Sequence, residues 1–425
     1  MSMLRAVGKR KKSRVMGKSQ ILGRPEYEAL DMDAKVELIR ALIPLGLMHV
    51  QELLDAEVCT LAGPRYSHDD TTSASRYGTN PGSVGLGGQR VPIRVPRVRS
   101  VQGEIPLKSY AGLSGRGEID QVLVRRVLYG VSCRNYAAAA EAIPGAIGLS
   151  KSTASRTFVE ASAAKLREFQ ERDLTGEDIV AMFLDGKTFA DSTMVVALGV
   201  TSSGEKPFLG FVETGTENAG TLTDFLRSLL DRGLDVSRGL LVVIDGAKGL
   251  RSAVKTALKG CAVVQRCAWH KRENVLRYLP RGDQPAWRRR LQRAYDRPTY
   301  AEALAALKAL HAELETKNQS AAASLAEGMD ETLTLHRLGV YGVLGRSLKT
   351  TNCLESVNSL VEERCAKVDS WKSSGQKQRW LTTALLDIEP RLRKIKGYKH
   401  LPELRAAIQG DLKIEVVDHS AKVAA

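Results

Sequence analysis

Ile179-Val-Ala-Met-Phe-Leu-Asp-Gly186 and Leu240-Leu-Val-Val-Ile-Asp-Gly246 repeat one pattern, an apolar run that ends at an Asp-Gly pair. A continuous apolar run of this length predicts a β-strand that is buried on both faces, as in a sheet covered by helices. We therefore expect strands at residues 179–184 and 240–244, each with an aspartate at its carboxyl end.

The residues around these two runs predict a mixed α/β fold. Apolar runs at 194–200 and 208–212 follow the first strand closely and indicate an antiparallel meander. Helical patterns at 222–230 and 248–258 flank the second strand, and a further strand is expected at 262–265. Beyond them, the composition predicts a helical insertion and two later helices, at 277–345, 348–368 and 380–396.

The two aspartates indicate a metal site. An unpaired carboxylate beside a dry sheet is unfavourable, so a cation is expected to compensate it. Glu355 would supply a third carboxylate near the start of a helix, where Thr351 and Asn358 fall on the same face. Oxygen ligands of this kind suit Mg²⁺ or Mn²⁺, and two such ions ~3.5–4 Å apart suit phosphodiester chemistry.

Each aspartate taken singly has a simpler explanation, because Asp-Gly after a strand is a common turn. Glu362 is a weaker candidate than Glu355, since it lies two helical turns further on, ~10.5 Å along the axis. The catalytic reading therefore depends on the two aspartates together with the polar stripe that contains Glu355.

The bulk composition favours a polyanionic partner. The 425-residue chain carries a net charge of +15, and residues 1–20 supply seven basic residues and no acid. Subtracting these seven charges from 15 still leaves +8, so the body is basic as well, which favours nucleic acid. No run approaches the ~20 apolar residues of a membrane span, and the N-terminus lacks the apolar region of a signal peptide.

A small β-unit is expected at residues 63–114, where Gly and Pro are frequent. Pro92 and Pro96 favour an edge strand over a central one. Its arginines would share an exposed face or edge: Arg90, Arg94, Arg97 and Arg99.

Residues 115–176 predict helices separated by short breaks. One ends at Gly130, a second spans 134–142, and a third begins at Lys151 after the capping residue Ser150. The last two of these helices fit a helix-turn-helix, because they are short and the one that begins at Lys151 is rich in Ser, Thr, Lys and Arg. Many helical bundles would give the same pattern. In the DNA-reading version, the contacts would come from Arg134, Ser152 and Arg156.

Two other site types are disfavoured by their motifs. Gly186-Lys187-Thr188 is similar to the end of a phosphate-binding loop, but the position of the first glycine is Ala181, so no ATP is expected. The six cysteines form no Cys-x-x-Cys pair, which suits a reducing cytosol. Cys267-x-x-His270 offers two ligands, too few for structural zinc, so no zinc is expected.

Four segments resemble the bacterial insertion-sequence transposases related to the eukaryotic Mutator elements. They are Phe183-Leu184-Asp185-Gly186, Val243-Ile244-Asp245-Gly246, Gln265-Arg266-Cys267-Ala268-Trp269-His270-Lys271-Arg272-Glu273-Asn274-Val275, and Thr350-Thr351-Asn352-Cys353-Leu354-Glu355-Ser356-Val357-Asn358. Shorter stretches at 76–78, 95–99 and 386–390 are similar as well, so that the resemblance covers roughly residues 25–410.

The resemblance implies a ribonuclease-H-like catalytic domain whose Asp-Asp-Glu triad is Asp185, Asp245 and Glu355. Such an enzyme would bind the terminal inverted repeats of an insertion sequence, expose a 3′-hydroxyl and join it to target DNA with two Mg²⁺ or Mn²⁺ ions. We expect further residues to support the active site, namely Cys267, His270, Asn352 and Asn358, and two more to contact DNA, namely Lys271 and Arg272.

These interpretations together predict the organisation of the chain. The segments are a basic arm (1–20), an N-terminal helical region (21–62), the β-unit (63–114), the helix-turn-helix region (115–176), the catalytic domain in two parts (177–276 and 346–396) around the helical insertion (277–345), and a C-terminal tail (397–425). The expected partner is double-stranded DNA, bound by a homodimer or higher oligomer in the bacterial cytoplasm, with no membrane partner. Two alternatives stay open: an inactive DNA-end-binding protein, and a nuclease of the same fold without strand transfer.

Overall fold

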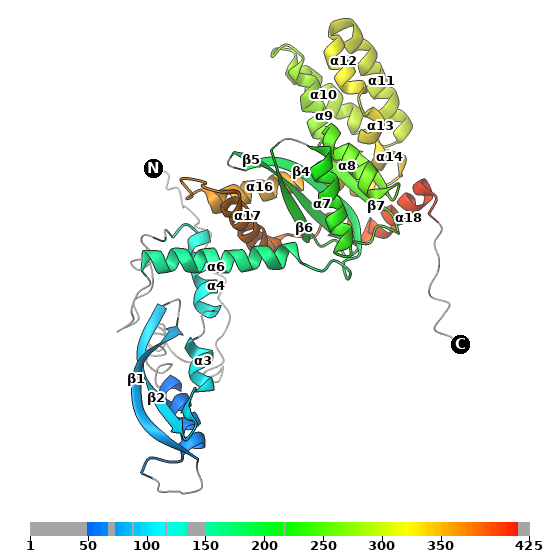
Figure 1. Cartoon of the computed structure of the whole chain (residues 1–425). Coiled ribbons are helices and arrows are strands. Elements are labelled where there is room, and N and C mark those ends of the chain that lie inside the picture. The colour runs from blue at the N-terminus through cyan, green and yellow to red at the C-terminus, as the bar shows by residue number, and fades with distance from the viewer. Residues whose placement is uncertain are drawn as a thin grey trace, which may run out of the picture. The chain divides into compact units, whose positions relative to one another are not determined.

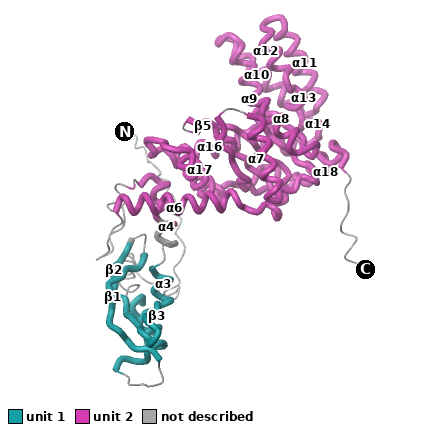
Figure 2. The backbone as a smooth tube through the Cα atoms, viewed as in Figure 1, with its two compact units in different colours: residues 1–119, 140–148 teal, residues 120–139, 149–425 magenta. Residues whose placement is uncertain are grey.

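The computed structural model describes residues 49–66, 73–86, 89–114, 117–131, 133, 150–189, 191–215 and 218–414. The chain divides into two compact units, which Figure 2 colours separately. Unit 1 falls within residues 1–119 and 140–148, and unit 2 within residues 120–139 and 149–425. The predicted basic arm, most of the N-terminal helical region expected at 21–62 and the helix expected at 134–142 lie outside the described residues.

Unit 1 contains the predicted β-unit. A helix at residues 49–62 packs its Val and Leu side chains against an antiparallel sheet of strand order β1-β2-β3. The elements are β1 (Ala74–Leu86), β2 (Gln89–Ser100), β3 (Gly103–Ile105) and α3 (Lys108–Ser114).

The edge prediction for the two prolines of β2 is right locally. The short strand β3 pairs only with residues 98–100 of β2, so Pro92 and Pro96 lie where β2 has β1 as its one partner. On the side of β2 that has no partner strand there, the missing N–H of a proline removes no ladder hydrogen bond. Further along, β2 is the central strand of the sheet.

Unit 2 is built around a five-stranded mixed sheet of order β6-β5-β4-β7-β8. The first three strands in the chain form the predicted antiparallel meander, and β7 and β8 add to it in parallel. Every residue of β7 is buried, as its continuous apolar run predicted. The strands are β4 (Ile179–Phe189), β5 (Ser192–Thr201), β6 (Phe208–Thr214), β7 (Leu240–Ile244) and β8 (Ala262–Arg266).

Helices cover both faces of this sheet (Figure 1). On one face, α7 (Ala219–Asp231) and α8 (Lys248–Leu258) bury their apolar sides against alternate residues of β4, β5 and β7. On the other face lie α16 (Asn352–Cys365) and α17 (Ser374–Ile388), in contact with β4 and β6 respectively.

The residues between β8 and α16 are helical, as expected for the insertion. They form α9 (Ala268–Arg277), α10 (Gln284–Tyr295), α11 (Tyr300–Lys317), α12 (Gln319–Ala326), α13 (Met329–Thr332), α14 (Thr334–Arg337) and α15 (Tyr341–Leu348). Their own apolar core, which includes Trp287, Leu291 and Leu307, is separate from the core under the sheet. The helical insertion therefore packs around its own apolar core, and the sheet packs around a different one.

The helix-turn-helix region is described only in part. α4 (Gly117–Leu128) precedes Gly130, whose φ of +96° suits the predicted C-cap, and Ser150 caps α6 (Lys151–Gln170) by accepting from the backbone N–H of Thr153 at 3.2 Å. α6 is 20 residues long, and its Phe158 ring lies 4.9 Å from the Trp380 ring of α17.

Two boundaries differ from the prediction. β4 continues past Leu184 to Phe189, because residues 186–189 still pair with β5. The helix expected at 380–396 is α17, which begins at residue 374 and ends at 388, and it is not the last one. The short helices η2 (Glu389–Arg391) and η3 (Tyr398–His400) follow, and α18 (Leu401–Leu412) buries Leu401, Leu404 and Ile408 within the segment expected as a tail. In the described part of the chain, no helix combines the length and the apolar character of a membrane span.

Candidate active site

The sheet places Asp185 and Asp245 side by side. β4 and β7 are parallel, and the last residue pair between them is Leu184 with Ile244. The next residue in each strand is an aspartate, so the two carboxylates leave neighbouring strands at the same level, with strand axes ~4.8 Å apart. β7 ends there, whereas β4 continues beside β5, with Asp185 directly opposite Val196.

The helix α16 brings Glu355 to this end of the sheet. Leu354 and Val357 are buried at 0% and 1% exposure and fix the helix on its apolar side. Thr351 precedes the first turn, and Glu355 lies in that turn. The remote acid is thus presented by a helix start on the sheet face opposite to α7 and α8.

The charges of the three acids affect one another. Burial raises the pKa of Asp185, the charges of Asp245 and Glu355 raise it further, and the nearby His270 lowers it, with a net result of about 7 instead of 3.8. Such a carboxyl group holds its proton near neutrality unless positive charge is brought to it.

Glu355 shows the same need for a partner. Its Oε1 atom is buried and has no hydrogen-bond partner, and the closest ionic group is His270, whose Nε2 lies 3.9 Å away. Among the described residues, no three His, Cys, Asp and Glu side chains are close enough to ligate a single ion as they lie. A cation fits the chemistry of these oxygen donors, because an unpartnered buried carboxylate oxygen is unfavourable.

Cys267 and His270 connect the sheet to the start of α16. Cys267 is fully buried, and its Sγ accepts from the backbone N–H of Thr351 at 3.4 Å and lies 3.6 Å from the Thr351 hydroxyl. That hydroxyl is also 3.3 Å from Nδ1 of His270. Burial alone would lower the pKa of His270, but Cys267 and the charges of Asp185 and Asp245 raise it to about 9. An imidazolium thus faces Glu355.

A profile of the family described as "Transposase, Mutator family" matches residues 21–390. The chain belongs to the Mutator family of transposases.

Curated relatives of this transposase bear consistent names. It is 30% identical over 253 residues to the transposase for insertion sequence element IS6120 of Mycolicibacterium smegmatis, which covers 58% of this chain and 76% of the relative. It is 27% identical over 383 residues to the transposase for ISRM5 of Rhizobium meliloti, covering 85% and 92%. The match to the transposase for IS905 of Lactococcus lactis is 28% over 235 residues, covering 54% and 58%.

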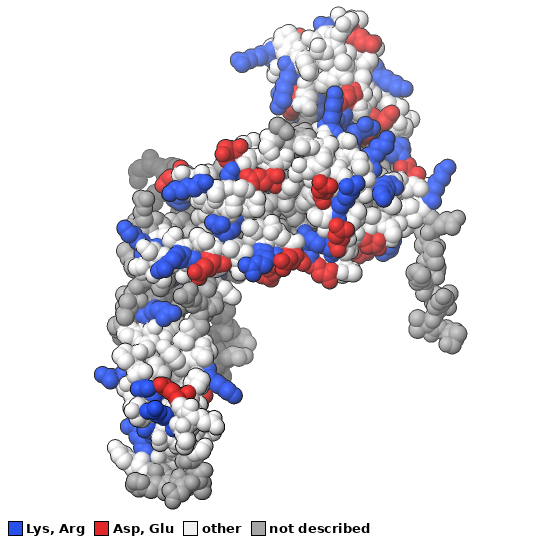
Figure 3. Space-filling model, in the orientation of Figure 1, with Lys and Arg blue, Asp and Glu red and all other residues white. Residues whose placement is uncertain are grey.

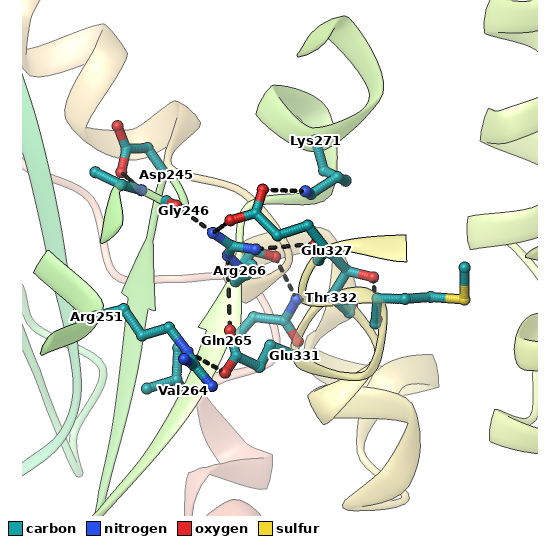
Figure 4. A network of polar contacts seen from close by, with 12 residues as sticks. Asp245, Gly246, Arg251, Val264, Gln265, Arg266, Lys271, Glu327, Glu331 and Thr332 are labelled. Carbon is teal, nitrogen blue, oxygen red and sulfur yellow. Dashed lines mark hydrogen bonds and ion pairs between the residues drawn. The ribbon is translucent and has the colours of Figure 1, made fainter. Parts of the chain in front are cut away.

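A buried arginine of the transposase joins the second aspartate to the helical insertion. Arg266, at the end of β8, is 3% exposed; it donates to the carbonyl of Gly246 and, at 3.0 Å, to that of Glu327. Glu331 lies 3.6 Å from its Nε atom. Figure 4 shows this guanidinium between the loop after Asp245 and the α12–α13 loop.

Sequence reasoning missed the role of Arg266, because a charged residue at a strand end is usually exposed. Two glycines with positive φ make room for it: Gly246 at +104° and Gly328 at +63°. A Cβ atom at Gly246 would lie 2.9 Å from Nε of Arg266, and one at Gly328 would collide with its guanidinium. The Asp-Gly pair and the Gln-Arg-Cys segment were both visible in the sequence. The contact between them forms only in the folded structure, so the sequence could not reveal it.

The predicted DNA contacts of the β-unit lie on its exposed face. Arg94 and Arg99 are exposed, and Arg97 forms a 2.6 Å ion pair with Glu104. The guanidinium groups of Arg97 and Arg99 each lie 5.1 Å from the ring centroid of Tyr77, an exposed aromatic residue that the sequence analysis did not single out. Figure 3 shows basic side chains over the visible face of this unit.

The other candidate contacts are distributed unevenly. Ser152 and Arg156 are exposed on α6, and Arg134 lies outside the described residues. Asn352 is exposed at the start of α16, where it lines a surface pocket with Trp269, and Asn358 faces a different pocket beside β4.

Lys271 and Arg272, which the sequence analysis expected to contact DNA, are enclosed by neighbouring residues in the structure. Lys271 is 4% exposed, and its ammonium donates to the carbonyl of Ser324 at 2.8 Å. The Arg272 side chain is 12% exposed and pairs with Glu273 at 2.9 Å. Lys271 thus joins α9 to α12, and Arg272 joins α9 to α10 through Gln292.

Proposed function

We propose that this transposase cleaves and joins DNA strands with two Mg²⁺ or Mn²⁺ ions held by Asp185, Asp245 and Glu355. The observation that carries the proposal is the buried Asp185 carboxyl, whose pKa is raised to about 7 by burial and by the charges of the other two acids. Carboxylates that repel one another at the end of a sheet are suited to bind divalent cations.

The fold supports the same proposal. An antiparallel meander of β4, β5 and β6 extended by parallel β7 and β8 is the sheet expected of a ribonuclease-H-like domain. The acids then come from the first strand, from the end of β7 and from a helix that crosses the same sheet face.

The chemistry divides between the ions and the residues of the chain. Bound divalent ions would activate the attacking hydroxyl and stabilise the leaving oxygen. The chain's own side chains hold the acids in place: the Cys267–Thr351 contacts fix the start of α16, and the protonated His270 orients Glu355 from 3.9 Å. Arg266 holds the carbonyl of Gly246 and so positions the loop that carries Asp245.

Binding of double-stranded DNA is assigned to the basic surfaces. The exposed arginines of β2, together with Ser152 and Arg156 of α6, would contact the terminal inverted repeats, chiefly through phosphates. Two element ends must be handled together, so we propose that a dimer or larger oligomer acts on them in the bacterial cytoplasm.

The test is cleavage of duplexes that carry the ends of the element, with Asp245→Asn as the variant. Asn keeps the oxygen that accepts from the Ala247 backbone N–H at 2.9 Å, so the turn is retained while the charge is lost. We expect metal-dependent cleavage to fall at least about a hundredfold, while the melting temperature without divalent ions is no lower than that of the unaltered protein.

The control is Asp224→Asn, which removes the same charge from an exposed position on α7. Undiminished cleavage by Asp245→Asn would overturn the triad. Cleavage without joined products when a target plasmid is supplied would indicate a nuclease. End binding by the unaltered protein without any cleavage would indicate an inactive DNA-end-binding protein.

A further inference from the structure

A pocket of about 200 Å³ lies beside the triad on the same sheet face. Its walls come from β4, β5, α16, α17 and the α16–α17 loop, all within unit 2. The lining residues are Lys187, Thr188, Phe189, Met194, Val196, Asn358, Val361, Glu362, Cys365, Ala366, Trp371 and Leu381.

The floor of the pocket continues the strand that carries the first acid. Lys187 is two residues after Asp185, so both side chains leave the same face of β4, ~6.6 Å apart. Across the strand pair, Val196 lies opposite Asp185 and Met194 opposite Lys187, and both line the pocket. Side chains of directly paired residues share a face, so Asp185 lies at the edge of this floor.

The roof of the pocket continues the helix that carries the third acid. Asn358 lies one turn after Glu355, ~4.5 Å along α16, on the same side of the helix. Glu362 lies a further turn on and pairs with Lys187 at 2.7 Å, which closes the far end. The pocket therefore begins two residues after Asp185 on β4 and one helical turn after Glu355 on α16.

The chemistry of the lining suits a flat heterocycle with polar edges. The half-buried Trp371 ring is held by Phe189 at 4.9 Å and Trp380 at 6.3 Å between ring centroids. The amide of Asn358 forms no hydrogen bond with another described residue, so it can both donate to and accept from a ligand. The volume is below the ~300–1,000 Å³ of pockets for drug-sized ligands, which favours a single ring system.

We propose that this pocket takes one unpaired nucleobase of the bound DNA, from a nucleotide next to the phosphate that the triad cleaves. The base stacks on Trp371, and Asn358 contacts its polar edge. The inference rests on the proposed function, since it is the bound DNA that supplies the base. Extraction of a base from a duplex is unfavourable in itself, and stacking on an aromatic side chain offsets part of that free energy.

The experiment measures how DNA binding depends jointly on the Trp371 side chain and on the base at each single DNA position. Duplexes carrying the element end are prepared intact and with one abasic site at each position around the cut. For intact DNA, Trp371→Ala is expected to weaken binding by about 5- to 150-fold. At the one position whose base enters the pocket, an abasic site removes this loss, whereas abasic sites elsewhere leave it unchanged.

Three further variants make the result specific. Trp371→Phe keeps an aromatic face and is expected to restore most of the binding, which guards against a merely structural loss. Asn358→Ala is expected to weaken binding at the same position, with a size that depends on the base placed there. Tyr278→Ala removes an exposed aromatic side chain at the end of α9, outside this pocket, and serves as the matched control.

The outcomes distinguish a failure of the base pocket from a failure of the proposed transposase function. If the unaltered protein binds and cuts its ends but no abasic position suppresses the Trp371→Ala effect, the base pocket is wrong and the transposase proposal stands. If the unaltered protein neither binds nor cuts element ends, the proposed function fails first. An equal effect of Trp371→Phe and Trp371→Ala at every position would overturn the stacking role.

Discussion

At the residue scale, Asp185 is the most informative side chain of the molecule. It is 7% exposed, it follows a fully buried strand segment, and its pKa is raised to about 7. A group whose folded pKa lies above its unfolded value of 3.8 binds more protons in the folded state. The contribution of Asp185 to the free energy of unfolding therefore falls as pH rises from about 4 to about 7.

Asp185→Asn is expected to remove this fall in stability. The variant should be more stable than the unaltered protein above pH 7 without divalent ions, by roughly 2–4 kcal/mol, and similar to it near pH 4. Urea unfolding at a series of pH values measures the difference. Comparison up to about pH 5.5 isolates Asp185, because His270, whose pKa rises from 6.5 in the unfolded chain to about 9 in the folded one, is largely protonated there in both states. A constant difference across this range would contradict the assignment.

Divalent ions should offset the loss of stability that ionised Asp185 causes at higher pH. We expect Mg²⁺ or Mn²⁺ to raise the melting temperature of the unaltered protein above pH 7 and much less near pH 5, because protons compete for Asp185. Asp185→Asn should lose most of this response. Equal stabilisation of both proteins at both pH values would place the bound ions elsewhere.

The sequence predicted these acids because their signal is local. A buried apolar run followed by Asp-Gly places a carboxylate at a sheet end, and the stripe of Thr351, Glu355 and Asn358 is visible from helical spacing alone. The burial of Lys271 and Arg266 could not be predicted in this way. It depends on α12 and on the Gly328 loop, which are remote in the sequence.

At the scale of elements, the presence of the strands and the antiparallel meander were predictable, and the lengths of the strands were not. β4 runs on past its apolar residues, because pairing with β5 stabilises Gly186–Phe189 without an apolar pattern. α18 had a usable signal in the helical spacing of Leu401, Leu404 and Ile408, which the expectation of a tail overlooked.

The contact between the helical insertion and the sheet can be tested through two glycines. Gly328 and Gly339 both have positive φ, at +63° and +73°, but a Cβ at Gly328 would collide with Arg266 while one at Gly339 meets open space. Gly339→Ala should therefore lower the free energy of unfolding by only ~1–2 kcal/mol, through backbone strain. Gly328→Ala should lower it by a further ~2–4 kcal/mol, because Arg266 is displaced from buried acceptors.

Chemical denaturation of the two variants measures this difference. Metal-dependent cleavage should fall with Gly328→Ala more than with Gly339→Ala, since Arg266 holds the carbonyl next to Asp245. Equal stability of the two variants would mean that Arg266 is not fixed between the two loops.

At the scale of the whole molecule, the net charge of +15 is spread over both units. Figure 3 shows acidic and basic groups interspersed over unit 2, so net charge alone does not identify the surface that meets DNA. Exposure separates the arginines better: Arg99 is exposed on a sheet face beside Tyr77, whereas Arg272 is enclosed by Glu273 and Gln292.

These two arginines should therefore respond differently to truncation. Arg99→Ala is expected to weaken DNA binding and to reduce the slope of log affinity against log salt by about 1, with little change in stability. Arg272→Ala should leave that slope unchanged and lower the free energy of unfolding by roughly 1–3 kcal/mol. Affinity titrations over a range of salt concentrations, together with melting curves, distinguish the two. The reverse pattern would reassign the DNA-facing surface.

The insertion of α9 to α15 leaves the sheet and returns to it at one narrow neck. The backbone N–H of Ala268 donates to the carbonyl of Lys349 at 3.0 Å, and Cys267 touches Thr351 just beyond. Parts of the insertion that lie away from this neck and away from the loop held by Arg266 can lengthen, shorten or be exchanged without shifting Glu355. Variation in chain length between the second and third acids is then tolerated during evolution. A designer could likewise replace the outer helices as one unit while leaving the reaction centre undisturbed.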